Sequence, residues 1–330
     1  MTDEVLDILI VGGGPVGLYA GFKAGLLNLR AIVVDKGRKW SRAYYVPKFH
    51  SIPFSPEGLS GRALIEGLRK ALGNVKDFVR VEDFVAVEGI EREADIFKSR
   101  GVYHPTKTAR VYRSKVVILA TGITDRQPLI GGELKTILPY ANKGLVHYCI
   151  ICDGNLARGQ NVAVIGHERR AAFTALDLMH FQPRAVNILT DGKKLFEGEL
   201  TENPDELREL RKTLESESVK VVEERILGLF GLEAGGFGVK LAGGREMSFD
   251  RAFSALGLYK MNNELAVQLG GKINEEGYIL VDGDCRVLDE NGSPVPGLYA
   301  IGDINSNWNQ IMVGFGDAER AVIHAFAEYL

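Results

Sequence analysis

Two cysteines separated by two residues, Cys149 and Cys152, are the side chains whose types and spacing most directly indicate chemistry, and Asp153 follows them. Cysteines at this spacing can close a small disulfide that exchanges readily with other thiols. A helix that begins at the pair would lower the pKa of a thiol at its N-terminus and give a thiolate near neutral pH. A carboxylic acid beside the pair can protonate a leaving thiolate. The three residues therefore predict a redox-active disulfide with Asp153 in proton transfer.

Other roles for the cysteine pair fit the sequence less well. A structural zinc site usually takes four ligands, but the chain adds only Cys285 and the nearby His147. A structural disulfide framework is not expected with three cysteines in 330 residues, and nothing indicates secretion. We therefore predict no metal site. Cys285 is expected to be a small buried residue on a strand, and His147 a packing or hydrogen-bonding residue that is secondary in proton transfer.

A dinucleotide-binding pattern opens the chain. A predicted buried strand runs into a G-x-G-x-x-G turn, a predicted helix follows, and a second strand ends in an acidic residue. The glycines permit a tight turn and close approach of a pyrophosphate to the helix N-terminus, and the acid can accept hydrogen bonds from a ribose diol. The whole set predicts a bound adenine dinucleotide. In chain order its parts are residues 7–11, Gly12, Gly14, Pro15, Gly17, residues 18–27, residues 31–34 and Asp35.

Two later segments favour FAD over NAD as that dinucleotide. Residues 116–122 are a predicted strand that leads to an A-T-G turn, and residues 296–303 are a strand that ends in Gly-Asp. Together they resemble the flavoprotein disulfide reductase superfamily, in which a Gly-Asp motif near the C-terminus holds the ribityl and pyrophosphate part of the flavin. The resemblance implies this role for Asp303, whose alternative role is to cap a following helix.

With the cysteine motif between these segments, the chain resembles the low-molecular-weight thioredoxin reductase family over nearly its whole length. The stretches that carry the resemblance are residues 53–61, 144–154, 309–311 and 314–317. It implies an α/β protein with two Rossmann-like, three-layer ββα nucleotide-binding domains. It also implies a homodimer that reduces a thioredoxin-like disulfide protein.

The same resemblance implies roles for single residues. In that family the second cysteine faces the isoalloxazine, the first attacks the partner's disulfide and the adjacent aspartate carries a proton. By position these are Cys152, Cys149 and Asp153. The residues expected to contact FAD are Gly12, Gly14, Pro15, Gly17, Asp35, Lys36, Val85, Ala120, Thr121, Gly122, Gly302, Asp303, Gln310 and Ile311.

The inserted part of the chain departs from the family, whose ordinary members have a second G-x-G-x-x-A/G turn and a basic H-R-R motif. Here a strand at residues 162–165 leads to Gly166, but Glu168 replaces the second glycine. Its side chain would fill the space of a pyrophosphate, and its charge would repel one. Residues 190–193 contain no arginine pair that could bind a 2′-phosphate. Asp191 could accept hydrogen bonds from the ribose of NAD, but only if the glycine turn still bound the pyrophosphate. We therefore do not expect NAD(P)H to bind.

Electrons must then enter from another donor. One candidate is a reduced ferredoxin, which the basic residues 36–39 and Arg42 could meet, although such a cluster is more commonly a solvated face. The other is a second FAD, on the surface or in the vacated nucleotide site, as in diflavin-linked relatives. Flat side chains replace the small loop expected after the second strand and could stack on a flavin, or pack in the core or at a dimer interface. They are Trp40, Tyr44, Tyr45, Phe49 and His50.

Length and composition suit a two-domain cytoplasmic protein. The motifs place a discontinuous FAD domain at residues 1–123 and 252–330 and an inserted disulfide domain at residues 124–251. Hydrophobic residues make up 45% of the chain, and no run of about eighteen apolar residues could span a membrane. Glycines and acidic residues interrupt the apolar start, which argues against a signal peptide. A net charge of -3 gives no reason to expect a nucleic-acid partner.

Three other functions remain open on the sequence alone. A dithiol oxidase, which closes a disulfide in a small metabolite and passes electrons to oxygen, shares this fold and cysteine pair, but often has histidine where this chain has Asp153. The second is an ordinary NAD(P)H-dependent thioredoxin reductase. The third is a flavoprotein with a vestigial redox function that serves as a binding or regulatory module, against which the presence of both cysteines argues modestly.

Overall fold

The computed structural model describes residues 5–55, 57–199, 203–233 and 235–329, and the chain divides into two compact units. The first unit comprises residues 1–46, 54–124 and 260–330, and the second comprises residues 47–53 and 125–259. This division differs from the expected boundary at Arg251, because the strand that begins there pairs with strands of the second unit.

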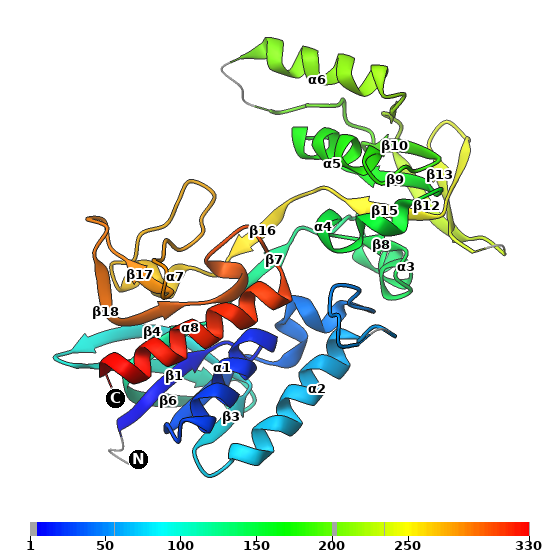
Figure 1. The fold of residues 1–330 in the computed structure, drawn as a ribbon. Helices are drawn as coiled ribbons and strands as arrows, with labels where there is room; N and C mark the ends of the chain where they lie inside the picture. The colour runs from blue at the N-terminus through cyan, green and yellow to red at the C-terminus, as the bar shows by residue number, and fades with distance from the viewer. Residues whose placement is uncertain (1–4, 56, 200–202, 234, 330) are drawn as a thin grey trace. The chain divides into compact units, whose positions relative to one another are not determined.

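One mixed sheet forms the centre of the first unit (Figure 1). Its strands are β1 (Val5–Val11), β2 (Ala31–Asp35), β3 (Val79–Asp83), β4 (Val85–Glu93), β5 (Ile96–Tyr103), β6 (Thr108–Leu119), β17 (Arg286–Leu288) and β18 (Pro294–Ala300). The order is β17-β18-β6-β1-β2-β3, and β4 and β5 extend β6 as an antiparallel arm. The strands from β18 to β3 are parallel, and their apolar runs are buried on both faces, as in β1 at Ile8, Leu9 and Ile10.

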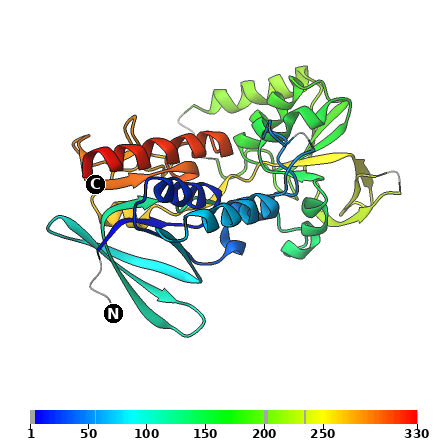
Figure 2. The ribbon, with the colours of Figure 1, turned by 60° about the horizontal axis from the view of Figure 1, so that its bottom comes forward.

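Helices cover one face of this sheet, and α1 and α8 lie side by side (Figure 2). The helices on this face are α1 (Pro15–Leu26), α2 (Gly61–Leu72) and α8 (Ile311–Tyr329). The short helix α7 (Glu264–Gln268) instead contacts β4, where the N–H of Ile90 donates to Gln268 Oε1 at 3.1 Å. The unit also has short 3-10 turns, η1 (Arg38–Trp40), η2 (Arg42–Tyr45), η3 (Gly73–Val75) and η6 (Gly302–Ile304). The ring of Tyr19 on α1 stacks on Phe315 with centroids 4.7 Å apart, and its hydroxyl donates to Glu319 at 2.6 Å. These contacts fix α8 against α1.

The second unit has three layers. Its strands are β8 (Val146–His147), β9 (Asn161–Ile165), β10 (Ala185–Leu189), β11 (Lys220–Val222), β12 (Ile226–Gly231), β13 (Phe237–Leu241), β14 (Glu246–Phe249) and β15 (Arg251–Ser254). A parallel sheet of order β11-β10-β9-β15-β8 forms the middle layer. The antiparallel sheet β12-β13-β14 packs on one face, and α5 (Arg169–Met179) and α6 (Pro204–Ser216) pack on the other. The remaining elements are α3 (Leu138–Asn142), α4 (Ile150–Asp153), η4 (Leu134–Thr136) and η5 (Gly154–Ala157).

The two units share a central strand arrangement. In the first sheet β1 lies between β2 and β6, and in the second sheet β9 lies between β10 and β15, which is the Rossmann-like arrangement. The prediction of an α/β protein with two such domains is confirmed. The chain passes between the units through β7 (Ile123–Asp125) and β16 (Leu258–Met261), which pair with each other. None of the helices in the described ranges is both long enough and apolar enough to span a bilayer.

Candidate redox disulfide and cofactor cavity

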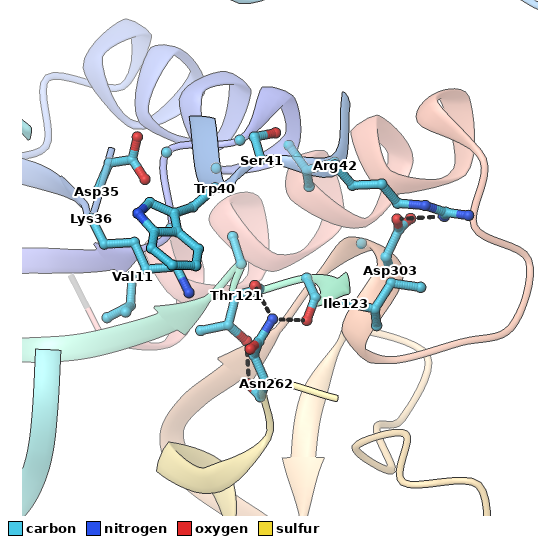
Figure 3. Close-up of a pocket in the computed structure, with 18 of the residues that line it drawn as sticks. Val11, Asp35, Lys36, Trp40, Ser41, Arg42, Thr121, Ile123, Asn262 and Asp303 are labelled. Carbon is cyan, nitrogen blue, oxygen red and sulfur yellow. Dashed lines mark hydrogen bonds and ion pairs between the residues drawn. The ribbon is translucent and has the colours of Figure 1, made fainter. Parts of the chain in front are cut away.

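A cavity of about 450 Å³ lies in the first unit (Figure 3). It opens at the carboxyl ends of three parallel strands, with Val11 at the end of β1, Asp35 at the end of β2 and Ala120 directly after β6. In an open α/β sheet this edge is where ligands bind. The cavity also receives residues from η1, from β4 and from the turn Gly302–Ile304. The fold therefore brings sequence-distant residues together at one ligand site.

The glycine turn after β1 packs tightly against the neighbouring backbone. Gly12 has a φ of +116°, and a Cβ on it would lie 2.2 Å from the carbonyl oxygen of Ala120. A Cβ on Gly17 would lie 1.9 Å from the carbonyl oxygen of Gly12. Gly14 precedes α1 and has no side chain with which to cap it, and Pro15 is the first helical residue. The N-terminus of α1 is therefore built to receive an anionic group such as a pyrophosphate.

Asp35 is the polar group that best tests whether an adenine dinucleotide fits. It is 6% exposed, and no described residue hydrogen bonds to its Oδ2. Burial raises the pKa of Asp35, and the backbone N–H of Gly37 offsets part of this effect. A Cβ on Gly13 would lie 2.6 Å from the Cβ of Asp35, so the glycine admits the carboxylate to the turn. A ribose diol would satisfy this buried acceptor, so these residues fit the nucleotide.

The residues near the other end of the cavity are held by polar contacts. Arg42 Nη1 lies 3.2 Å from Asp303 Oδ2, as Figure 3 shows. The side-chain amide of Asn262 donates to the carbonyl oxygens of Thr121 at 3.1 Å and Gly122 at 2.9 Å. The hydroxyl of Thr121 donates to the carbonyl oxygen of Asn262 at 2.6 Å. The A-T-G turn is therefore fixed by a residue that no motif predicted.

All but one of the residues predicted to contact FAD line this single cavity. Those that line it are Gly12, Gly14, Pro15, Gly17, Asp35, Lys36, Val85, Ala120, Thr121, Gly122, Gly302, Asp303 and Ile311. Gln310 is not among the lining residues; it precedes α8, and its carbonyl oxygen accepts from the N–H of Gly314 at 3.0 Å. Sequence reasoning missed other lining residues, among them the polar residues Ser41, Glu88, Lys260, Asn262 and Glu264.

The flat side chains predicted as a stacking platform are distributed over different places. Trp40 lines the cavity, with Lys36 Nζ 4.8 Å from the centre of its ring. Tyr44 packs against the core of the first unit. Phe49 and His50 belong to the second unit. The five side chains therefore do not form one stacking platform within either unit.

Cys149 and Cys152 form a disulfide in the second unit, with Cα atoms 5.3 Å apart. A helix begins at the pair: Cys149 is the N-cap of α4, and its Sγ accepts a hydrogen bond from the N–H of Cys152 at 3.1 Å. That donor will stabilise a thiolate on Cys149 after reduction. Cys285 is 1% exposed, and burial raises its pKa to about 12. It precedes β17 with a φ of 64° instead of lying on the strand, which corrects the expectation.

Asp153 has a partner that sequence reasoning placed in a secondary role. Its Oδ2 lies 2.9 Å from Nδ1 of His147, which is 7% exposed. On the other side of the ring, His147 Nε2 lies 3.3 Å from Nη1 of Arg251. The ring also stacks on Phe253, with centroids 5.1 Å apart. The sequence could indicate His147 only as a histidine close to the cysteine pair. Arg251 is remote in sequence and becomes its neighbour through the pairing of β8 with β15.

The degenerate glycine turn of the second unit ends at α5, whose start is occupied by a carboxylate of the chain itself. Glu199 Oε1 accepts a hydrogen bond from the backbone N–H of Arg169 at 2.8 Å, and Glu199 Oε2 accepts from Nε of Arg169 at 2.8 Å. Burial raises the pKa of Glu199, but the two bonds from Arg169 outweigh this, and its pKa lies below the ordinary value. Glu168 is the N-cap of α5 and lies 3.6 Å from Arg126 Nη1.

The acid predicted as a possible ribose acceptor is also engaged within the protein. Asp191 Oδ1 accepts a hydrogen bond from the N–H of Ile226 at 2.8 Å, which ties the turn after β10 to the start of β12. The N–H of Phe196 donates to the carbonyl oxygen of His167 at 2.6 Å, so the loop that carries Glu199 is tied to the degenerate turn. The groups that would meet a ribose and a pyrophosphate are therefore bonded to the chain itself.

Comparison with known proteins agrees with this geometry. The family model described as pyridine nucleotide-disulphide oxidoreductase matches residues 6–322. Thioredoxin reductase from Treponema pallidum is 28% identical over 330 residues, which cover 98% of this chain and 97% of that protein. A component of alkyl hydroperoxide reductase from Xanthomonas campestris is 26% identical over 98% of this chain, which spans 57% of that relative. The crystal structure of thioredoxin reductase from Streptococcus pyogenes has the same fold, with a TM-score of 0.79 over 99% of this chain and 98% of that chain at 22% identity.

Proposed function

The chain belongs to the pyridine nucleotide-disulphide oxidoreductase family and is an FAD-dependent disulfide oxidoreductase of the thioredoxin reductase type, but we propose that its electron donor is not NAD(P)H. A one-electron protein such as reduced ferredoxin supplies the electrons instead. They pass to the Cys149–Cys152 disulfide and on to a thioredoxin-like protein. FAD, when bound, supplies the two-electron step that joins the donor to the disulfide.

The observation that carries this proposal is the carboxylate of Glu199 at the start of α5. A nicotinamide dinucleotide would have to place its pyrophosphate where Glu199 bonds to Arg169, and beside the side chain of Glu168. Displacing a bonded carboxylate and bringing two like charges together both disfavour binding. The same argument disfavours a second FAD in this place, since FAD has the same pyrophosphate. A second FAD elsewhere stays the alternative donor.

Cys149, Cys152 and Asp153 have different roles in disulfide exchange. The thiolate of Cys149 attacks the partner's disulfide, forms a mixed disulfide and releases one partner sulfur, which takes a proton from Asp153. The thiolate of Cys152 then attacks Cys149 Sγ, which re-forms the Cys149–Cys152 disulfide and releases the partner's second sulfur as a thiolate. Two electrons have then moved from this chain to the partner. The amide bond of Cys152 to Cys149 Sγ favours the attacking thiolate.

The residues that hold FAD in this proposal are those of the cavity in the first unit. The turn from Gly12 to Gly17 receives the pyrophosphate at α1, and Asp35 receives the ribose diol. Asp303 takes the ribityl portion, as the resemblance implies, and Arg42 adds a positive charge beside it. The homodimer and the cytoplasmic location predicted from the sequence stay predictions.

An anaerobic turnover assay tests the proposal. Purified protein with FAD is given thioredoxin and, in separate reactions, reduced ferredoxin, NADPH or NADH, and new thiols on thioredoxin are counted. We expect turnover with ferredoxin alone, and none with ferredoxin in a Cys152→Ser variant of equal FAD content. Turnover with NADPH or NADH would overturn the proposal and show that the protein is an ordinary NAD(P)H-dependent thioredoxin reductase. Oxygen uptake with a small dithiol, without thioredoxin reduction, would instead support a dithiol oxidase.

A further inference from the structure

We propose that His147 is a positioning residue for Asp153, and that Arg251 locks its ring as the neutral tautomer that carries its proton on Nδ1. This inference rests on the proposed role of Asp153 in proton transfer at the disulfide. The three side chains form one line of contacts, from Arg251 Nη1 to His147 Nε2 at 3.3 Å and from His147 Nδ1 to Asp153 Oδ2 at 2.9 Å.

The chemistry of the guanidinium fixes the tautomer. An arginine side chain can only donate hydrogen bonds, so His147 Nε2 must be the acceptor and cannot carry a proton in this contact. The same Nη1 also donates to the carbonyl oxygen of Gly144 at 3.0 Å, which holds the guanidinium in place. The single ring proton is therefore on Nδ1, where it is donated to Asp153.

The sheet holds this arrangement in place. His147 lies on β8 and Arg251 at the start of β15, and the two strands pair in parallel with His147 opposite Phe253. Phe253, which is 1% exposed, stacks against the imidazole ring. The ring is thus held by the sheet, while Asp153 stands at the end of α4. The contact therefore orients the carboxylate from a ring that the sheet holds.

This geometry separates positioning from acid catalysis. A neutral imidazole that gave up its Nδ1 proton would become an anion, so His147 does not supply the proton of the exchange step. Its bond engages Oδ2 of Asp153 and leaves Oδ1 as the oxygen that takes and gives a proton. The role resembles that of outer-shell partners that orient a reacting side chain without touching the substrate.

Two substitutions at His147 separate the donor from the ring. In His147→Asn the amide nitrogen can stand where Nδ1 stood and donate to Asp153, whereas His147→Phe keeps the stacking on Phe253 and has no donor. Each variant is reduced with dithiothreitol, freed of reductant and mixed with oxidised thioredoxin in a single-turnover experiment. We expect H147F to slow disulfide exchange by about tenfold and H147N to stay within about threefold of the parent. This assay bypasses the electron donor, so its result is independent of the donor proposed above.

A double variant shows whether His147 acts through Asp153. In a D153N background H147F should cause no further slowing, because the carboxylate that it orients is gone. Equal slowing in both backgrounds, or an H147N variant as slow as H147F, would overturn the proposal. Unchanged exchange in D153N alone would overturn the proton-transfer role of Asp153 and with it the positioning role.

Nitrogen NMR of the imidazoles in the unsubstituted holoprotein tests the tautomer directly. We expect one histidine ring that carries its proton on Nδ1 and has a bare Nε2. H147N, which should lose that signal, provides the assignment. A ring at position 147 that carries its proton on Nε2, or that is doubly protonated, would contradict the locked tautomer.

Discussion

Burial separates the cysteines of this chain into two chemical kinds. Cys149 and Cys152 are joined at the start of α4, where a backbone N–H points at the first sulfur. Cys285 is enclosed in the core of the first unit, and burial raises its pKa to about 12. At neutral pH it is a shielded thiol, which is a poor nucleophile. Among the cysteines, redox chemistry is therefore expected at the pair and not at Cys285.

Alkylation with iodoacetamide, read by peptide mass spectrometry, checks this division. We expect no labelled cysteine in the oxidised folded protein, labelling of Cys149 and Cys152 after mild reduction, and labelling of Cys285 only in denaturant. The physical reason is the lack of solvent access and of thiolate at Cys285. Labelling of Cys285 in the folded protein at neutral pH would contradict the account.

The residues of the site differ in how far the sequence could predict them. The disulfide pair could be predicted locally, because two cysteines separated by two residues can close a small disulfide. The glycines of the first turn follow from a local pattern too. His147 could be noted only as a residue type, since its function depends on Arg251, which reaches it through strand pairing more than a hundred residues later. Asn262 carries no motif, and only the fold brings its amide to the A-T-G turn.

At the scale of elements, the start of α5 depends on a side chain from a distant loop. Glu199 is 13% exposed in its side chain and accepts two hydrogen bonds from Arg169 at the positive end of the helix. We expect Glu199→Gln to lower the free energy of unfolding of the protein at pH 7 by about 1–2 kcal/mol, because a charge-assisted bond is lost. Glu206→Gln is the control: Glu206 lies 3.8 Å from Arg169 Nη1 but is 48% exposed, so its removal should matter little.

The effect of E199Q should depend on pH with a definite sign. The pKa of Glu199 in the folded protein is below its ordinary value of 4.5, so the folded state favours the carboxylate. The stabilisation is complete above the ordinary value and is lost as the pH falls through the lowered one. Urea unfolding of both proteins at neutral and acidic pH measures the difference. An E199Q protein as stable as the parent at pH 7, or a gap unchanged in acid, would contradict this reading.

The turn between β1 and α1 gives a second test at this scale. Gly12→Ala places a Cβ where φ is +116° and where it would lie 2.2 Å from a carbonyl oxygen. We expect a loss of at least about 2 kcal/mol of stability and a lower FAD content. Gly67→Ala in α2, with nothing within 4 Å of its Cβ, should instead stabilise by about 0.5–1 kcal/mol. Thermal unfolding and flavin absorbance measure both, and an unaffected G12A protein would argue against the turn as the nucleotide site.

Elements with a local signal were predictable, and long-range contacts between them were not. The buried runs of β1, β2 and β6 and the glycine turn are visible in the sequence, because strand burial and turn geometry act on neighbouring residues. The loss of the second turn is visible too, through Glu168. The contact of Glu199 with Arg169 was not, because it depends on where a loop thirty residues away returns to the helix.

At the scale of the whole molecule, the chain is two Rossmann-like units with the same arrangement of their central strands, β6-β1-β2 and β15-β9-β10. Motif positions could not place the return from the second unit to the first, because residues 252–254 continue a strand of the second unit. Nor could they assign residues 47–53, which belong to the second unit although they lie within the first unit's sequence range. The molecule combines one cavity that fits an adenine dinucleotide with one turn closed by its own carboxylate.

An anaerobic titration of the flavin spectrum tests the absence of a nicotinamide donor most directly. The ratio of flavin to protein is measured first, and NADPH, NADH and reduced ferredoxin are then added to separate samples. The account predicts bleaching by ferredoxin and an unchanged spectrum with either nicotinamide, while a ratio near two would show a second FAD. Prompt bleaching by NADPH or NADH would contradict it, because Glu199 and Glu168 would then not exclude the pyrophosphate.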